Sequence, residues 1–491
     1  PIKHYKAVAE IAAFCRQTTL TFLKAVLKYR NSLERKEGVV MDRICAVVIF
    51  VVMFGLIIWD RFPRHWVTLS GGVAVLLVVF GLCRHSWTDI WETLNLTCFF
   101  RSNFWYEAAE SSGGINWSTI TFVAGMMVMV AGMAQGGIFR WLCLKIAGWV
   151  HYRTVPLLLC FMLVSGVLSM FIDSITVLLF LAAVTAELAQ LLRFDPIPMV
   201  LAEIFCANLG GSATMCGDPP NIIIGTSLGF SFTDFLTNTG LIALICFAVV
   251  VLYFYLCFHR PLMASEKVRP ANIAYPDAAT VVTDRPAFYG CSAVFLLVVA
   301  MLVTHAETGL TVSAIGCIAA VLTALVVWCT SGGRTALGLF SKIDHKTLLF
   351  FIGLFVAVSG LQRTGCLDVL AGGIAQLSGG SSKVMLAIIL WVSAVASAFI
   401  DNIPFAATMV PVIRSMAAAQ GVDLTALAWA LSLGTDLGGS ATPIGASANV
   451  VGISVAAQNG YKVSWGRYRY CAPATVLAVT ISMLCLFARY L

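Results

Sequence analysis

The sequence contains one polar motif twice, at matching positions in two apolar halves. Residues 208–221 read NLGGSATMCGDPPN and residues 436–449 read DLGGSATPIGASAN, 228 positions further along. The shorter segments FIDSI at 171–175 and FIDNI at 399–403 are separated by the same 228 positions. Paired polar breaks at equivalent places in two hydrophobic halves are the best sequence indication of a transporter's binding site.

The composition places this duplication in a membrane. Of the 491 residues, 59% are hydrophobic and 11% are charged, too few polar residues to cover a soluble core of this size. Apolar windows suited to about 30 Å of hydrocarbon recur along the chain. The clearest are 44–59, 66–83, 120–135, 241–257, 293–304, 312–329 and 348–361. We therefore expect an all-α polytopic integral membrane protein, in the cell membrane or, in a eukaryote, an organelle membrane.

Charge and cysteine content argue against several other classes. The net charge of +7 is modest and lies mainly in connecting segments, which suits contact with lipid headgroups, and no nucleic-acid-binding motif occurs. The 16 Cys have no Cys-x-x-Cys or Cys/His metal spacing, so we interpret them as small buried hydrophobic residues. Without a nucleophile–base pair, a metal cluster or a Walker A loop, we expect neither an enzyme nor a resident cofactor.

The chain divides into four predicted parts. Residues 1–43 hold nine Lys and Arg among apolar residues at helical spacing, which predicts a basic amphipathic helix at the membrane interface. Residues 44–259 form a first transmembrane repeat and residues 288–491 form a second. The charged, Pro-containing segment 260–287 is the linker between the repeats.

Each repeat contains the same predicted order of spans, helical hairpin and broken helix. The hairpins are expected at about 155–192 and 383–420, and the broken helices at about 197–229 and 425–457. A hairpin that enters and leaves on one side gives five crossings per repeat, and an odd number inverts the second repeat relative to the first. Irregular backbone cannot face lipid, so the hairpin tips and the breaks are expected to be buried or to face water.

Glycines extend the duplication beyond the motifs. Gly125 matches Gly353 at the same offset of 228, whereas Gly72 matches Gly316 at an offset of 244. The first repeat therefore carries an insertion of sixteen residues, which we place within 85–114. This segment is rich in Trp and Phe, as is typical of the membrane interface.

The hairpin tips each carry an acid in an apolar segment, where an unpaired carboxylate is costly. A helix N-cap explains an Asp at a chain break, but it does not explain why both copies keep the acid. We predict that Asp173 and Asp401 bind the coupling ion, H⁺ or Na⁺, together with Asp218, Ser174 and Asn402. Any Na⁺ would bind at Asp173 and Asp401.

The two breaks supply groups that suit a substrate. Their glycines allow close backbone approach, and their prolines stop the helix and free carbonyls upstream. Freed carbonyls and hydroxyls suit Na⁺, half-helix N-termini suit an anion, and Asn221 and Asn449 are placed to cap the resuming helices. The predicted substrate-binding residues are Gly211, Ser212, Thr214, Asn221, Gly439, Ser440, Thr442 and Asn449.

The two copies are not equivalent in charge. Asp218 aligns with Ala446, and Asn208 aligns with Asp436, so the two sides of the site carry different acids. This difference is expected if one repeat binds a cation more strongly. A further intramembrane acid, Glu203, fits a proton-relay residue and a hydrogen-bonded structural carboxyl equally well.

The motifs resemble those of the ArsB/NhaD permeases of the ion transporter superfamily, and within them the P protein-like branch. The matching residues are GDPPN at 217–221 with IIIG at 222–225, FIDNIPF at 399–405 and IGASANVV at 444–451. The resemblance runs from about residue 44 to the C-terminus. It implies two inverted repeats, opposed re-entrant hairpins, a homodimer and elevator-type movement of a transport domain.

The related divalent anion/sodium symporters carry Ser-Asn-Thr at the hairpin tips. Here the matching positions are Asp173-Ser174 and Asp401-Asn402, which favours proton or sodium exchange over dicarboxylate transport. We predict a secondary active transporter that couples an H⁺ or Na⁺ gradient to movement of a small inorganic ion or organic anion. Arsenite-type efflux and Na⁺/H⁺ antiport are the leading candidates. The alternative is a gated anion channel or conductance regulator on the same scaffold.

Overall fold

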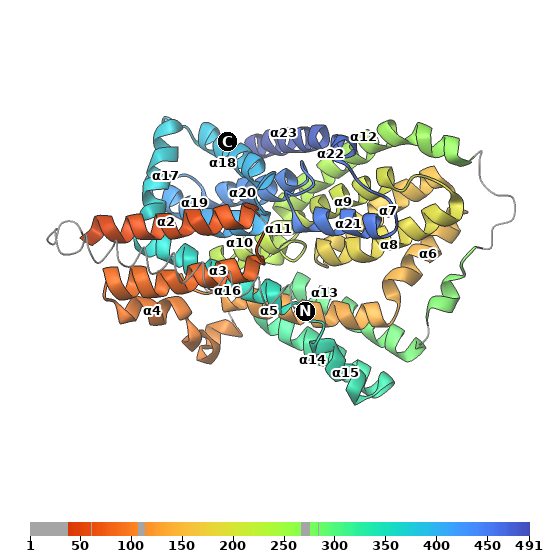
Figure 1. The fold of residues 1–491 in the computed structure, drawn as a ribbon, viewed down its shortest axis with the longest axis horizontal. Coiled ribbons are helices and arrows are strands. Elements are labelled where there is room, and N and C mark those ends of the chain that lie inside the picture. Colours follow the sequence, from red (N-terminus) through yellow and green to blue (C-terminus); the bar gives the residue numbers. More distant parts are fainter. Residues whose placement is uncertain (1–37, 60, 107–112, 267–274, 283) are drawn as a thin grey trace. The chain divides into compact units, whose positions relative to one another are not determined.

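The computed structural model describes residues 38–491 except 60, 107–112, 267–274 and 283 (Figure 1). Nearly all of the expected interfacial segment 1–43 lies outside the described residues, as does the middle of the expected linker 260–287. In the described chain, the elements are helices.

Nine helical segments in this part of the chain are long and apolar enough to cross a membrane. A helix rises about 1.5 Å per residue, so about 20 residues cover the hydrocarbon core. The segments are Met41–Trp59, Arg64–Cys83, Trp117–Gln135, Ser174–Leu192, Phe232–Glu266, Arg285–Thr308, Val312–Ser331, Gly333–Arg363 and Trp465–Tyr490. The all-α, polytopic fold class expected from the sequence is therefore confirmed.

The helices pack as two compact units, and neither unit is one half of the sequence. The smaller unit contains the described parts of Pro1–Thr97, Ser112–Asn116 and His345–Leu370. The larger unit contains the described parts of Cys98–Ser111, Trp117–Asp344 and Ala371–Leu491. Each unit thus draws helices from both sequence repeats.

The smaller unit is centred on a close helix pair. Its helices are α2 (Gly38–Trp59), α3 (Arg64–Ala74) with its continuation η1 (Val75–Cys83), α4 (Trp87–Leu94) and α16 (His345–Arg363). A Cβ added to Gly72 on α3 would lie 3.1 Å from the carbonyl oxygen of Gly353 on α16. Two small residues therefore allow the backbones of α3 and α16 to approach closely, as in other membrane helix pairs.

The larger unit contains the equivalent helix pair, in which each helix comes from the other repeat. Helix α5 (Trp117–Gln135) packs against α14 (Val312–Ser331), where a Cβ on Gly125 would collide with the backbone of Gly316. Gly125 is the sequence match of Gly353, and Gly316 is the match of Gly72. The glycines identified by the duplication therefore make the same kind of contact in both units.

The hairpin and break segments lie together in the larger unit. The first repeat provides α7 (Thr154–Ser169), α8 (Ser174–Leu192), α9 (Ile197–Gly211) and α10 (Pro219–Leu228). The second provides α18 (Ser382–Ser397), α19 (Asn402–Gln420), α20 (Leu424–Gly439) and α21 (Ser447–Gln458). The 15 residues of α9 cover only about 22 Å, less than the hydrocarbon core of a membrane.

The resumed helix of each break packs against the hairpin of the other repeat. Helix α21 lies along α8 and α9, and α10 lies along α19 (Figure 1). Leu178 and Ile204 of the first repeat share a buried apolar cluster with Ala448 and Val455 of the second. This exchange brings the hairpin tips and the breaks of both repeats into one region.

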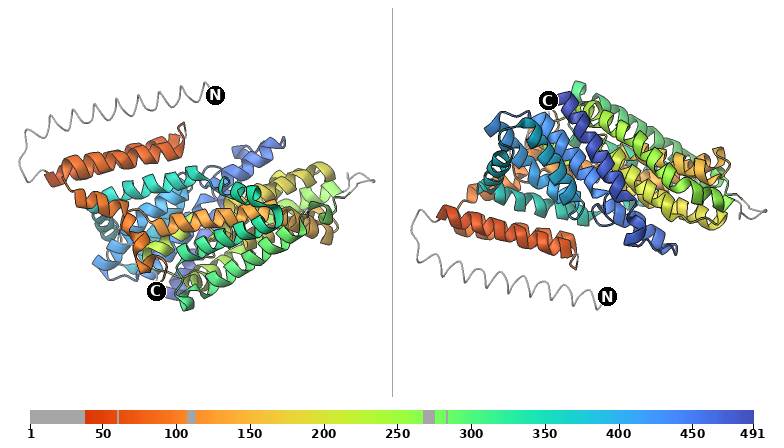
Figure 2. Two further views of the ribbon diagram at one scale, coloured as in Figure 1. Left: turned by 90° about the horizontal axis from the view of Figure 1, so that it is seen from below. Right: turned by 90° about the horizontal axis from the view of Figure 1, so that it is seen from above.

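Two long helices of the larger unit, α12 (Leu241–Glu266) and α23 (Cys471–Tyr490), lie side by side (Figure 2). Helix α12 continues into the segment expected to be the linker. The remaining helices of the described chain are α6 (Ile138–Trp149), α11 (Phe232–Phe235), α13 (Arg285–Thr308), α15 (Gly333–Phe340), α17 (Cys366–Leu377) and α22 (Trp465–Tyr468). Short 3₁₀ helices are η2 (Leu96–Phe100), η3 (Ser102–Phe104) and η5 (Ala278–Val281), and η4 (Leu236–Gly240) is a short π-helix.

Candidate ion and substrate site

One carboxylate at the first break receives a hydrogen bond from each hairpin tip. Asp218, which directly precedes α10, is buried. The hydroxyl of Ser174 donates to Oδ1 over 2.7 Å, and the amide nitrogen of Asn402 donates to Oδ2 over 3.0 Å. Ser174 and Asn402 are the first residues of α8 and α19. Three of the five predicted coupling residues therefore meet directly.

The other two predicted coupling residues are the N-caps of the same helices. Asp173 accepts a hydrogen bond at Oδ2 from the backbone N–H of Thr176 over 3.2 Å, while its buried Oδ1 has no partner. Asp401 accepts from the N–H of Ile403 over 3.2 Å and from the hydroxyl of Ser447 over 2.6 Å. The N-cap interpretation is therefore correct for both acids, and it leaves one carboxylate oxygen of Asp173 unused.

These acids lie close enough to interact electrostatically. The carboxylates of Asp173 and Asp401 both interact electrostatically with the carboxylate of Asp218. Three carboxylates held together in a low-dielectric interior repel one another unless a proton or a cation compensates them. Binding of a coupling ion by these acids stays a prediction.

The first break is braced by an asparagine. Asn221 donates its amide hydrogens to the carbonyls of Gly211 and Thr214, over 3.0 and 3.2 Å. The N-cap of α10 is Asp218, so the prediction that Asn221 caps this helix is wrong. The physical reason is that Asn221 lies inside the first turn, where the carbonyls freed at the end of α9 compete for its amide hydrogens.

The second break repeats this brace. Asn449 donates to the carbonyls of Gly439 and Thr442, over 2.7 and 2.8 Å, and the N-cap of α21 is Ala446. The capping prediction is therefore wrong for Asn449 as well, for the same reason. Matching partners at an offset of 228 show that the two sequence motifs fold into the same local structure.

Most predicted hydroxyl ligands hold the breaks in place. Thr214 donates to the carbonyl of Met170, and Thr442 donates to the carbonyl of Ala398, at the end of the hairpin helix of its own repeat. Ser212 donates to the carbonyl of Leu209 over 2.7 Å. The protons of these three hydroxyls are therefore used by the scaffold.

The two breaks also bond to each other, through a residue outside the predicted site. The amide of Asn208 donates to the hydroxyl of Ser440 over 3.0 Å and to Oδ1 of Asn449 over 2.8 Å. Its sequence counterpart Asp436 is fully buried, and neither carboxylate oxygen has a hydrogen-bond partner. The signal that could have found this pair is the Asn-to-Asp difference between the aligned motifs.

The breaks differ in exposure. In the first, Cys216 is 4% exposed, whereas its counterpart Ile444 in the second is 47% exposed. Thr442 is also partly exposed, whereas Thr214 is fully buried. The second break is therefore the more exposed of the two.

The site is acidic and carries no fixed positive charge in its own segments. Residues 170–176, 208–221, 398–404 and 436–449 contain no Lys or Arg. Within the described residues, no group of three or more His, Cys, Asp and Glu is arranged to hold a metal ion. Single carboxylates, backbone carbonyls and hydroxyls suit H⁺ or Na⁺ better than a tightly held transition metal.

Nine apolar spans in the described part of the chain, together with the family match that follows, identify an integral membrane transporter. The chain matches the citrate transporter family, CitMHS, over residues 54–434. An uncharacterized transporter of Mycobacterium bovis is 32% identical over 451 residues, covering 91% of this chain and 98% of that protein. The chain therefore belongs to the CitMHS family.

Other similarities agree with this family. The P protein of Homo sapiens is 27% identical over 551 residues, which cover 96% of this chain and 62% of P protein. The resemblance to the P protein-like branch is therefore confirmed. The YdaH transporter of Alcanivorax borkumensis has a similar fold, with a TM-score of 0.56 and 15% identity over 84% of this chain and 91% of its own. MtrF of Neisseria gonorrhoeae has a TM-score of 0.51 and 12% identity over 82% and 85%.

Proposed function

We propose that this protein is a secondary active transporter that couples an H⁺ or Na⁺ gradient to movement of a small inorganic ion or organic anion. The observation that carries the proposal is the meeting of Ser174 and Asn402 at Asp218. Both hairpin tips donate hydrogen bonds to this one carboxylate. A proton or cation bound to Asp218 would therefore change how both tips are held.

The charge of the site suggests an order of binding. Asp173, Asp218 and Asp401 present negative charge, and the surrounding segments provide no Lys or Arg. An anionic substrate would meet repulsion until a cation or proton neutralises these acids. Binding of the coupling ion therefore precedes binding of an anion, and the half-helix N-termini then supply its positive partial charge.

The substrate candidates follow from the charge of the site and from the family. Na⁺/H⁺ antiport needs only the carboxylates, and arsenite-type efflux needs a small neutral or anionic ligand. Citrate, which names the family, would need cations to screen its charge. Antimetabolites are a further candidate, because MtrF is described as representing a class of antimetabolite efflux pumps.

The movement that we propose is of the elevator type in a homodimer with inverted repeats. The grouping of both hairpins and both breaks in the larger unit supports this, because one body then carries the complete site. In such a cycle, ion binding at Asp218 would hold the hairpin tips closed while the site changes sides.

Transport by purified protein in proteoliposomes tests the proposal. We expect gradient-driven flux of one candidate among Na⁺/H⁺, arsenite, chloride, antimetabolites, citrate and other carboxylates, and its loss in Asp218→Asn. Asp195→Asn is the matched control, because Asp195 forms a surface ion pair with Arg467 and such pairs contribute about 0–1 kcal/mol. Large unitary currents independent of a coupling gradient would instead identify the channel alternative.

A further inference from the structure

Two thiols of the smaller unit are in contact. The Sγ atoms of Cys45 on α2 and Cys83 on η1 lie 3.9 Å apart, and both side chains are thiols in the structure. A disulfide bond is about 2.05 Å long, so a change of side-chain rotamer must bring the two sulfurs closer by about 1.9 Å. The pair therefore meets the first requirement for a disulfide, which is two sulfurs close together on adjoining helices.

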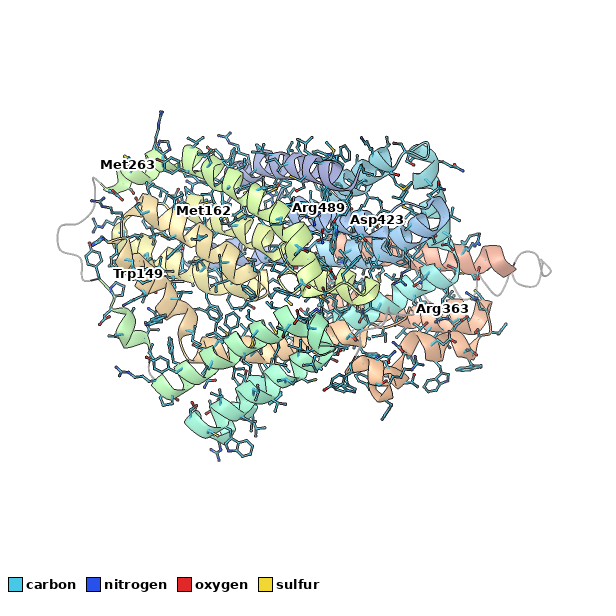
Figure 3. The ribbon with its side chains drawn as sticks, turned by 180° about the vertical axis from the view of Figure 1, so that it is seen from behind. Trp149, Met162, Met263, Arg363, Asp423 and Arg489 are labelled. Atoms are coloured by element: carbon cyan, nitrogen blue, oxygen red, sulfur yellow. The ribbon has the colours of Figure 1, made fainter. Side chains whose placement is uncertain are left out.

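The helix ends that carry these thiols are held at one place by neighbouring carbonyls. Arg363, labelled in Figure 3, is the last residue of α16. The guanidinium of Arg84, the residue after the second thiol, donates to the carbonyl of Arg363. That of Arg43, two residues before the first thiol, donates to the carbonyl of Thr364 over 2.9 Å. Two successive carbonyls thus anchor the start of α2 and the end of η1, which keeps the two thiols together.

The two thiols differ in their access to water. Cys45 is buried, with 1% of its surface exposed. Cys83 is half-buried, is the last residue of η1, and is followed by the exposed residues Arg84 and His85. Oxidants act on the accessible thiol of a pair. Cys83 is therefore the thiol that reacts first, and Cys45 is the thiol that attacks it afterwards.

The thiol at the end of η1 is a feature of the first repeat alone. At the offset of 244 that matches Gly72 to Gly316, Cys83 matches Val327 in α14. Helix α14 is α-helical at this point, whereas η1 is a π-helix of nine residues. π-Helical turns are rare and occur frequently at functional sites. The duplicated fold therefore does not require a thiol here.

We infer that Cys45 and Cys83 are a modification site at which hydrogen peroxide forms a disulfide between α2 and η1. The thiolate of Cys83 attacks one peroxide oxygen and the O–O bond breaks, which leaves a sulfenic acid and a hydroxide that takes up the proton released by Cys83. The sulfur of Cys45 then attacks the sulfur of Cys83, the S–O bond breaks, and the hydroxyl group leaves with the Cys45 proton as water. The two thiols lose two electrons, and the peroxide is reduced to two waters.

A disulfide fits this pair better than a bound metal ion. Structural zinc sites use four protein ligands. Among the residues that the structure describes, no three His, Cys, Asp or Glu side chains converge to hold a metal. Two thiols in contact need no further ligand to form a disulfide.

The modification site is separate from the candidate ion and substrate site. Both thiols belong to the smaller unit, whereas the hairpins and breaks belong to the larger unit. The disulfide would link α2 to the helix that already packs against α16 through Gly72 and Gly353. The inference therefore goes beyond the proposed function and does not depend on it.

Mass spectrometry of the purified full chain in detergent tests the site. The protein is treated with hydrogen peroxide, unfolded, alkylated and digested with trypsin without reduction. Trypsin cuts at the Arg residues that flank each thiol, which leaves the two thiols in separate peptides, 44–61 and 65–84, with one Cys each. We expect these peptides to be joined with the loss of two hydrogens, and to separate on reduction. The link should form at least about tenfold faster in the folded protein than in the urea-unfolded chain, because the fold holds the thiols together.

Cysteine variants test the order of the two steps. Cys83→Ser should leave Cys45 as a thiol that is alkylated after unfolding, because peroxide does not reach it. Cys45→Ser should leave Cys83 without a partner, so that its sulfenic acid is oxidised further to a sulfinic acid. Cys317→Ser is the matched control, because Cys317 on α14 is also half-buried, and it should keep the joined peptides.

Three results in the wild type would overturn the inference. The first is recovery of the two peptides unlinked, with Cys83 as a sulfinic acid, which would show that Cys45 does not reach it. The second is a link from either peptide to a different Cys. The third is an equal rate in the unfolded chain, which would show that the fold does not hold the pair. Misfolding of a variant leaves these three readouts intact, and none of them requires transport.

Discussion

The amide of Asn402 donates a hydrogen bond to the carboxylate of Asp218 over 3.0 Å, across 184 residues of sequence. The second hairpin is thereby tied to the break of the first repeat. Ser174 completes the arrangement from the first hairpin, over 2.7 Å. One carboxylate thus accepts a hydrogen bond from both tips. In the proposed mechanism, an ion bound there would control their movement.

Asn402→Asp should make transport dependent on acid pH. The substitution places a second carboxylate opposite Asp218, and two such groups share a proton instead of both ionising. We expect flux at pH 8 to fall at least about tenfold while flux at pH 5–6 is kept, since a gap of one pH unit corresponds to a tenfold change in protonation. Proteoliposome flux across this pH range measures the effect. Asn103→Asp, at an exposed position, is the control, and a parallel loss in both variants would contradict the explanation.

Asp173→Asn and Asp401→Asn should each abolish pH- or Na⁺-dependent transport without loss of the fold. Asn is about as good an N-cap as Asp, so α8 and α19 keep their first turns. The variants lose the negative charge that attracts the coupling ion. Flux in proteoliposomes with and without a pH or Na⁺ gradient measures this, with gel filtration as the folding control. Unchanged coupling in both variants would remove these acids from the site.

Gly210→Ala should destabilise the larger unit. A Cβ at Gly210 on α9 would collide with the backbone of Gly166 on α7, which cannot yield as a flexible side chain can. Overpacking of this kind costs about 1–3 kcal/mol. Gly148→Ala is the matched control, because a Cβ at Gly148 in α6 meets nothing within 4 Å. Thermal unfolding in detergent compares the two, and equal stability would show that the close contact is not required.

Glu203→Gln should leave ion coupling unchanged. The carboxyl group of Glu203 is fully buried and is held at Oε1 by the hydroxyl of Thr185 over 2.5 Å. An uncharged amide of the same size can accept the same hydrogen bond, so we favour the structural role over a proton relay. The stoichiometry of H⁺ movement in proteoliposomes decides this point, and a loss of H⁺ coupling with flux retained would restore the relay.

The identity of the site segments could be predicted because it rests on repeated local patterns. The FID tips and the two Gly-rich breaks stand out as polar interruptions of apolar sequence, and the structure brings them together in one unit. The capping roles of Asn221 and Asn449 were predicted wrongly. Both side chains donate hydrogen bonds instead to carbonyls at the end of the preceding helix. Capping preferences consider only the helix that follows, so they do not predict this partner.

By itself, the sequence determined the membrane class, the duplication and the acids at the two tips, because hydrophobicity and internal repetition are properties of the chain read in order. Only the tertiary structure decided that Asp218 accepts hydrogen bonds from both hairpin tips and that Asn208 joins the two breaks. The physical reason is that a carboxylate's state depends on the donors around it, and here they come from helices far apart in sequence.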